Sequence, residues 1–148
     1  MTKLLVALIA ILVPLGLVAC GGDDEGPSKA EFIEKADTIC AKSDKDTNAI
    51  FEEAFEDPQK PKPDEAQAAI KKALPVVKEN LEELKDLETP KDDEEDVETI
   101  WASVQTGIET LEEASASPDS SLAALLSEPF AQADKLAKDY GMKDCGQE

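Results

Sequence analysis

The sequence predicts an all-α fold, an antiparallel bundle of about four amphipathic helices, two of them with proline kinks. From Ser28 onward, apolar residues recur at intervals of three and four, which is the period of an amphipathic helix. No stretch shows the strict alternation that is typical of a half-buried strand. Short connections separate four such segments, and short connections favour antiparallel neighbours. The bundle is therefore expected to occupy residues 29–148.

The first helix is expected over residues 29–56. Ser28 and Glu31 form the Ser-x-x-Glu pattern of a capping box, in which each side chain accepts a hydrogen bond from the other residue's backbone amide. The apolar stripe weakens over 43–48, which indicates a bend or an exposed turn. Residues 57–63 form a linker, because their prolines cannot continue a helix. The apolar positions are Phe32, Ala36, Ile39, Cys40, Ile50, Phe51, Ala54 and Phe55.

The second and third helices are expected over residues 64–87 and 91–114. Pro75 lies inside the second and should kink or interrupt it, because proline removes one backbone hydrogen bond. Pro90 marks the start of the third helix, where its missing amide donor costs little. The predicted buried face of the second helix comprises Ile70, Leu74, Val77, Leu81 and Leu84, and that of the third comprises Val97, Trp101, Val104, Ile108 and Leu111.

The fourth helix is expected from Pro118 to Tyr140, with Gly141 as its C-cap. Pro129 breaks or kinks it, so two shorter helices are the alternative. Its predicted apolar face comprises Leu122, Leu126, Phe130, Ala133, Ala137 and Tyr140. Two kinked helices in one bundle can splay apart and leave a cavity, which is a common place for ligands. The alternative is that Pro75 and Pro129 each mark a helix end.

The charge of the chain excludes several classes of function. The 148 residues include 34 acidic and 15 basic ones, for a net charge of −19, and all the basic residues are lysines. Without histidine, Ser-His-Asp and Cys-His catalysis and imidazole metal sites are excluded. Without arginine, bidentate recognition of phosphate is excluded as well. Nucleic acid is not expected as a partner, because its phosphates would be repelled.

The N-terminus reads as a secretory signal peptide. Lys3 provides a positive start, and a largely apolar run follows over residues 4–18. This run contains Pro14 and Gly16 and falls short of the roughly 20 residues that span a bilayer.

Residues 17–20, Leu-Val-Ala-Cys, resemble the bacterial lipobox. In proteins with this motif the cysteine thiol receives a diacylglyceryl group, and the peptide bond before it is cut. The resemblance implies a signal peptide at 1–19, a lipidated acidic tether at 20–28, and Cys20 as the lipidation site. Two acyl chains would anchor the protein stably in a membrane. The alternatives are an uncleaved anchor, or an ordinary secretory signal with a chance cysteine.

The remaining cysteines, Cys40 and Cys145, form an even pair in a chain that is predicted to be exported. Such a pair favours one disulfide bond, which would join the first helix to the C-terminus. The alternative is two free thiols. No Cys-x-x-Cys spacing supports a redox site.

Other candidate sites have simpler interpretations. Consecutive acids at 92–96 point around a helix, so they are expected to offset the dipole at a helix start rather than to converge on a metal ion. The acids at 44–46 lack the glycine and distal glutamate of an EF-hand. Trp101 is in register with the apolar face and is expected in the core rather than as a stacking residue. We expect no catalytic, metal-binding or cofactor-binding residue and no cofactor.

A wider resemblance combines the lipobox, the helix that carries Ile39-Cys40, and the C-terminal residues 138–146. Together they are similar to small helical lipoproteins exported by Gram-positive bacteria, in which the two cysteines pair and most members have no assigned activity. The absence of arginine departs from that pattern.

These observations favour a non-enzymatic binding module on the outer face of the cell membrane, anchored by lipid. Its expected partner is a peptide, an envelope protein or a small apolar ligand. The alternative is an acidic interaction or spacer protein, and the third hypothesis is a carboxylate-dependent enzyme. The oligomeric state stays open.

Overall fold

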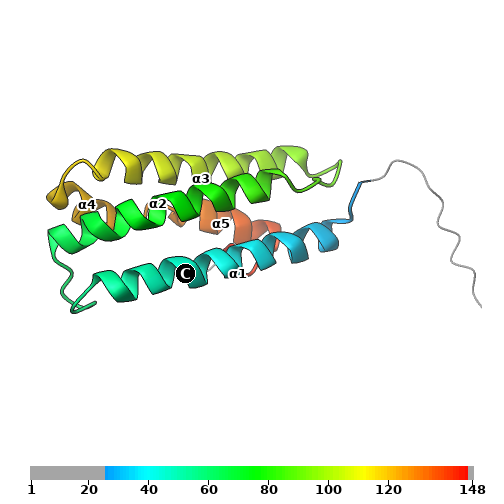
Figure 1. Ribbon diagram of the computed structural model, residues 1–148. Helices are drawn as coiled ribbons and strands as arrows, with labels where there is room; N and C mark the ends of the chain where they lie inside the picture. Colours follow the sequence, from blue (N-terminus) through cyan, green and yellow to red (C-terminus); the bar gives the residue numbers. More distant parts are fainter. Residues whose placement is uncertain (1–25, 147–148) are drawn as a thin grey trace, which may run out of the picture.

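The computed structural model describes residues 26–146, and the helical bundle expected from the sequence is confirmed there. This part of the chain contains no strand and five helices, α1 (Lys29–Ala54), α2 (Pro63–Lys85), α3 (Glu94–Ala114), α4 (Pro118–Leu126) and α5 (Ala131–Tyr140). The three long helices lie side by side with alternating direction, and α4 and α5 together fill the fourth position behind them (Figure 1). The predicted signal peptide and the predicted lipidation site Cys20 lie outside the described residues.

The start of α1 has the predicted capping box. The Ser28 hydroxyl accepts from the Glu31 amide at 3.3 Å, and the Glu31 carboxylate accepts from the Ser28 amide at 3.0 Å. Hydrogen bonds from the Ser28 hydroxyl and then from its amide lower the pKa of Glu31. Both interactions occupy groups that a helix start otherwise leaves without a partner, so they fix the first turn.

The expected turn at 43–48 is absent, because α1 continues as one helix to Ala54. Its polar residues fit a helix here, since the Thr47 hydroxyl donates to the Ser43 carbonyl one turn earlier at 2.8 Å. The predicted burial of α1 is wrong in its second half. The buried residues end at Ser43, whereas Ile50 and Phe51 are only half-buried.

The two prolines behave differently. Pro75 is exposed, and α2 passes through it as one helix, because solvent can reach the Lys71 carbonyl that loses its amide donor. Pro129 lies between α4 and α5, which confirms the alternative of two shorter helices. The preceding residue, Glu128, has a positive φ of 50°, so the chain direction changes sharply there.

Helix α3 starts at Glu94 rather than at the predicted residue 91. Residues 91–93 instead form a turn, in which the Asp93 amide donates to the Pro90 carbonyl at 3.0 Å. The Asp93 side chain does not cap its own helix. It accepts a hydrogen bond from the Tyr140 hydroxyl at 2.7 Å and thereby joins the start of α3 to the end of α5.

The predicted face of the last segment is also corrected. Leu126 is 71% exposed, although the helical period assigns it to the core. Ser121 is fully buried instead, and its hydroxyl donates to the Ala114 and Ser117 carbonyls at 2.9 and 2.8 Å. The break before α5 interrupts the helical register, so a period counted across it assigns residues to the wrong side.

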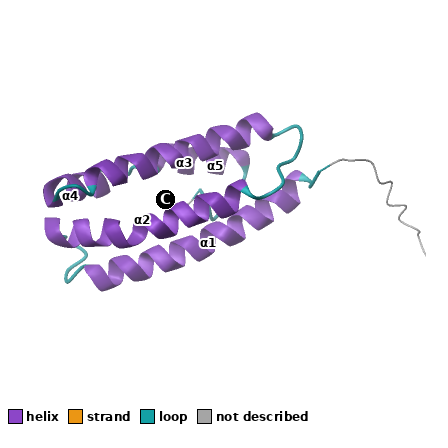
Figure 2. Ribbon diagram, turned by 45° about the horizontal axis from the view of Figure 1, so that its top comes forward, coloured by secondary structure: helices purple, strands orange, loops and turns teal. Residues whose placement is uncertain are grey.

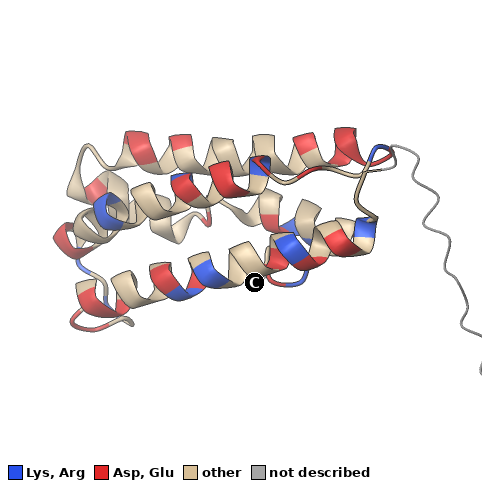
Figure 3. Ribbon diagram, turned by 45° about the vertical axis from the view of Figure 1, so that its right-hand side comes forward, with Lys and Arg blue, Asp and Glu red and all other residues tan. Residues whose placement is uncertain are grey.

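The main core lies between α1, α2, α3 and α5, and Trp101 belongs to it, as predicted, at 7% exposure. A smaller cluster under α4 contains Ile70, Leu111 and Ala124. Most acidic side chains point outward, and acidic turns are spread along the outside of the bundle in Figure 3. This distribution is consistent with a solvated surface for most of the charge.

The predicted disulfide between Cys40 and Cys145 is present, with the two Cα atoms 5.1 Å apart. Gly141 caps α5 in the left-handed conformation, as predicted, with a φ of 113°. The segment that follows turns back to the middle of α1, where the disulfide holds it. There the Asp37 carboxylate accepts hydrogen bonds from the Lys143 and Asp144 amides at 2.9 and 3.0 Å. Figure 2 shows the helices in purple and the connections between them in teal.

Removal of the disulfide should therefore destabilise the fold. All buried core residues lie between Phe32 and Met142, so a protein that begins at Gly21 keeps the described core and avoids the thiol of Cys20. In that background the double variant Cys40→Ser, Cys145→Ser should lose up to about 4–5 kcal/mol of unfolding free energy, because the bridge closes a long loop. Urea unfolding measures the loss. As a control, reduction of the unmutated protein should lower the urea midpoint as much as the double substitution does. An unchanged urea midpoint would contradict a stabilising role of the disulfide.

Candidate functional site

A pocket of about 300 Å³ lies between the helices, where the backbones of α1 and α5 stay apart. The backbone of α1 lies close to α2, and that of α5 lies close to α3, whereas α1 and α5 meet through side chains such as Phe32 and Tyr140 at the start of α1. The C-terminal segment 141–146 crosses only part of the space between them, at the disulfide. We call this space the interior pocket.

The walls of the interior pocket are mainly apolar and come from all five helices, with α4 contributing only Leu125 near its end. Trp101 and Val104 of α3 form one side, and Phe130, between α4 and α5, forms another. Val77 of α2 and Phe51 of α1 are also exposed to the space. Concave, mostly apolar spaces with few polar groups are typical of small-ligand sites.

The polar residues of the wall largely satisfy backbone groups. The Asn80 amide donates to the Ile39 carbonyl at 3.1 Å and joins α2 to α1. The Thr47 hydroxyl donates within α1, to the carbonyls of Ser43 and Asp44. These side chains stabilise the helices that frame the pocket, and they leave its interior apolar.

Carboxylates gather at the gap between α1 and α5. Asp44 of α1 and Asp144 of the C-terminal segment line the interior pocket, and Asp134 follows the lining residue Ala133 on α5. Burial, and then the charges of Asp44 and Glu128, raise the pKa of Asp134 to about 6. Burial and the Asp144 charge also raise the pKa of Asp44. We call Asp44, Asp134 and Asp144 the acidic gap.

Gly107 positions one wall of the pocket. A Cβ atom at this buried position of α3 would lie 2.4 Å from the Phe130 ring and 2.9 Å from the Pro129 carbonyl oxygen. Only glycine therefore lets the connection between α4 and α5 approach α3 so closely. An isolated glycine inside a helical pattern is the sequence signal for such a contact, and our sequence analysis did not use it.

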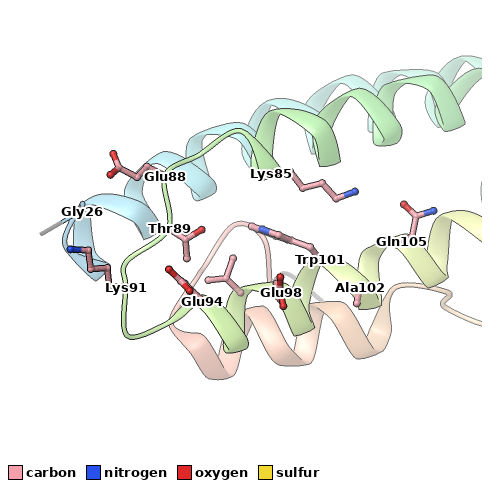
Figure 4. A pocket seen from close by; sticks show the side chains of 11 residues that line it. Gly26, Lys85, Glu88, Thr89, Lys91, Glu94, Glu98, Trp101, Ala102 and Gln105 are labelled. Atoms are coloured by element: carbon pink, nitrogen blue, oxygen red, sulfur yellow. The ribbon is translucent and has the colours of Figure 1, made fainter. Parts of the chain in front are cut away.

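A second, larger hollow of about 760 Å³ lies on the surface between the end of α2 and the first half of α3 (Figure 4). Its lining includes five charged residues, Lys85, Glu88, Lys91, Glu94 and Glu98. Trp101 lines both spaces and separates this groove from the interior pocket. Because the lining of the groove is more polar, the mainly apolar interior pocket is the stronger candidate for ligand binding.

The acidic run at 92–96 lies at the start of α3, with Glu94, Glu95 and Asp96 in the first turn. Asp93 accepts from Tyr140 and also lies 3.7 Å from the Lys29 ammonium, which stands over the Tyr140 ring. Within residues 26–146, no group of three or more acidic or cysteine side chains is arranged to hold a metal ion. The role of Asp93 is therefore structural, because it joins the start of α3 to Tyr140 and Lys29.

Among the helices of residues 26–146, none has both the length and the apolar character of a membrane span. Comparison of the chain with protein-family models, curated proteins and solved structures finds no match.

The Gly107→Ala variant should test the close approach. Alanine favours a helix by about 1 kcal/mol over glycine. The clash with Phe130 and Pro129 should nevertheless destabilise the protein by about 1–3 kcal/mol, the usual cost of overpacking. Chemical denaturation measures the change. Thr106→Ala, at the neighbouring exposed position, is the control and should stay within about 0.5 kcal/mol. An increase in unfolding free energy on Gly107→Ala would contradict the close approach of Phe130 and Pro129 to Gly107.

Asp134 should make the protein less stable as pH rises. Burial raises its pKa from the ordinary 3.8 to about 6 in the fold, so the folded state holds the proton more tightly across that interval. Stability is therefore expected to fall as pH increases through this window. Asp134→Asn should remove that part of the slope and raise the melting temperature at neutral pH. Melting curves across the window provide the measurement, and an unchanged slope in the variant would refute the assignment.

Proposed function

We propose that this protein is a non-enzymatic binding module that holds a small, mainly apolar ligand in the interior pocket and is anchored by lipid at Cys20 on the outer face of a cell membrane. The observation that carries the binding proposal is the pocket itself. Small-ligand sites are usually concave, mostly apolar spaces of roughly 300–1,000 Å³ with a few polar groups. A space of about 300 Å³ with mainly apolar walls has this character.

The pocket favours a binding module over an acidic spacer. A spacer requires a solvated surface and rigid helices, and neither property requires an apolar hollow at the centre. In this bundle the second half of α1 contributes Phe51 to the pocket instead of burying it against another helix. An apolar ligand would cover that surface and gain free energy by removing it from water.

The carboxylates support an enzyme less well. General acid–base catalysis by two carboxylates needs pKa values that are driven apart, so that one group is protonated and the other is ionised. Here burial raises the pKa of both Asp44 and Asp134. The hydroxyl of Thr47, which could otherwise act on a bound substrate, is engaged by the backbone of α1. The pocket thus has features that hold a molecule rather than transform it.

The predicted anchor fits this arrangement. The predicted tether has only eight residues, Gly21 to Ser28, between the lipidation site and α1, which would keep the start of α1 near the membrane surface. Asp44 lies fifteen residues along α1 from Lys29, about 22 Å at the helical rise. The acidic gap would then be above the lipid surface and accessible to molecules that leave or enter it.

Native mass spectrometry of the full-length protein, extracted gently from its own membrane, tests this proposal. The covalent mass should include two acyl chains on Cys20 and the two-hydrogen deficit of the disulfide. A reproducible additional mass, lost on activation in the gas phase, should report the ligand.

A pocket-filling variant is the matched control. Val104→Phe adds bulk from a half-buried position that lines the pocket, so the extra mass should disappear while the covalent mass changes only by the substitution. Cys20→Ser should abolish acylation but retain the ligand. An unlipidated native protein would refute the anchor, and a ligand retained by Val104→Phe would refute the site.

A further inference from the structure

We propose that the occupant of the interior pocket is an apolar molecule with one amine, whose ammonium group lies against Asp44 and Asp134 in the acidic gap. This inference rests on the function proposed above and names the chemical class of its ligand. The apolar walls would contact the hydrocarbon part of the ligand, and the carboxylates would bind its ammonium group.

The acidic gap combines three parts of the chain that are remote in sequence. Asp44 comes from α1, Asp134 from α5, and Asp144 from the segment after Gly141. All three are half-buried, in contrast to the many fully exposed acids of the outer surface. Asp44 and Asp144 line the interior pocket, and Asp134 follows the lining residue Ala133, so the charge lies beside the apolar space.

Two members of the acidic gap, Asp44 and Asp134, form no ion pair with a lysine of the described residues. The ion pairs of the neighbouring helical turns are Lys42 with Asp46 on α1 and Lys135 with Asp139 on α5. Asp93 provides a contrast, because Lys29 and the Tyr140 hydroxyl both face it.

The gap therefore carries repulsion that a cation would relieve. Lys138 lies one turn beyond Asp134 on α5, yet the pKa of Asp134 remains raised, first by burial and then by Asp44 and Glu128. A bound ammonium would replace that repulsion by attraction, and its own hydrogen atoms would be donated to carboxylate oxygens. A bound carboxylate would add to the repulsion, and a neutral head group would leave it unchanged.

The size of the pocket restricts the ligand to a small molecule. At about 300 Å³ the space is at the lower end of the roughly 300–1,000 Å³ that is usual for ligand sites. A single alkyl chain or a small ring system with one amine matches both this size and the charge at the gap.

Three probes test which head-group charge the pocket prefers. Decylamine, decanol and decanoate have alkyl chains of the same length and different head groups. The protein begins at Gly21, which keeps the entire described core. The chain has one tryptophan, Trp101, and it lines the pocket, so its fluorescence reports occupancy. Decylamine should bind about tenfold more tightly than decanol, because its ammonium would form two partly buried ion pairs. Decanoate should bind most weakly.

Matched variants separate the acidic gap from the overall negative charge. Asp134→Asn should weaken decylamine binding about threefold and leave decanol binding unchanged. Asp86→Asn makes the same charge change at the exposed end of α2 and should affect neither probe. Val104→Phe should abolish the Trp101 response to all three probes.

Each outcome decides one of the two proposals. Equal binding of decylamine and decanol, or equal effects of Asp134→Asn and Asp86→Asn, overturns the proposal that the ligand carries an amine. The proposal that the pocket binds an apolar ligand then still stands. Decylamine binding that persists in Val104→Phe takes place on the surface and also overturns the amine proposal. Failure of all three probes to change Trp101 fluorescence overturns the pocket as a ligand site, and with it both proposals.

Discussion

The attachment of the C-terminal segment to α1 is the constraint on which the rest of the structure depends. Among the helices, the backbone of α1 packs closely only against α2, so the C-terminal segment provides most of the backbone contact on its other side. The disulfide between Cys40 and Cys145 provides a covalent link on that side, and the Asp37 carboxylate receives several amides of the same segment. At the start of α1, the Phe32 and Tyr140 rings meet edge to face, with centroids 6.1 Å apart.

This attachment explains why a pocket exists. A narrow segment bridges α1 and α5 where a well-packed bundle would have two helices in direct contact, and a segment without a continuous apolar face cannot fill the same volume. The break at Pro129 contributes as well, because it moves the connection between α4 and α5 toward α3, where Gly107 makes room for Phe130. The two features leave part of the surface of Trp101 and Val104 facing the interior pocket.

The half-buried carboxylates divide into two kinds. Asp93 is compensated by the Tyr140 hydroxyl and the Lys29 ammonium, and it holds the start of α3 against the end of α5. Asp44 and Asp134 have no such partners among the described lysines, and each has a raised pKa. Carboxylates that reduce the stability of the folded protein are retained most readily where they act on another molecule, and this contrast is the electrostatic basis for assigning them to a ligand.

The sequence by itself determined the features that depend on local order. The helical period predicted the all-α fold, Ser28 and Glu31 predicted the start of α1, Gly141 predicted the end of α5, and the cysteine count predicted the disulfide. Only the tertiary structure decided which apolar residues are covered, because burial depends on elements that are distant in sequence. Leu126 turned outward and Ser121 inward because the break at Pro129 reset the register, and Phe51 is only half-buried because the backbone of α5 makes no close contact with α1. The interior pocket and the acidic gap follow from the same cause, since Asp44, Asp134 and Asp144 converge only when the C-terminal segment returns to α1, and no spacing along the chain encodes that approach.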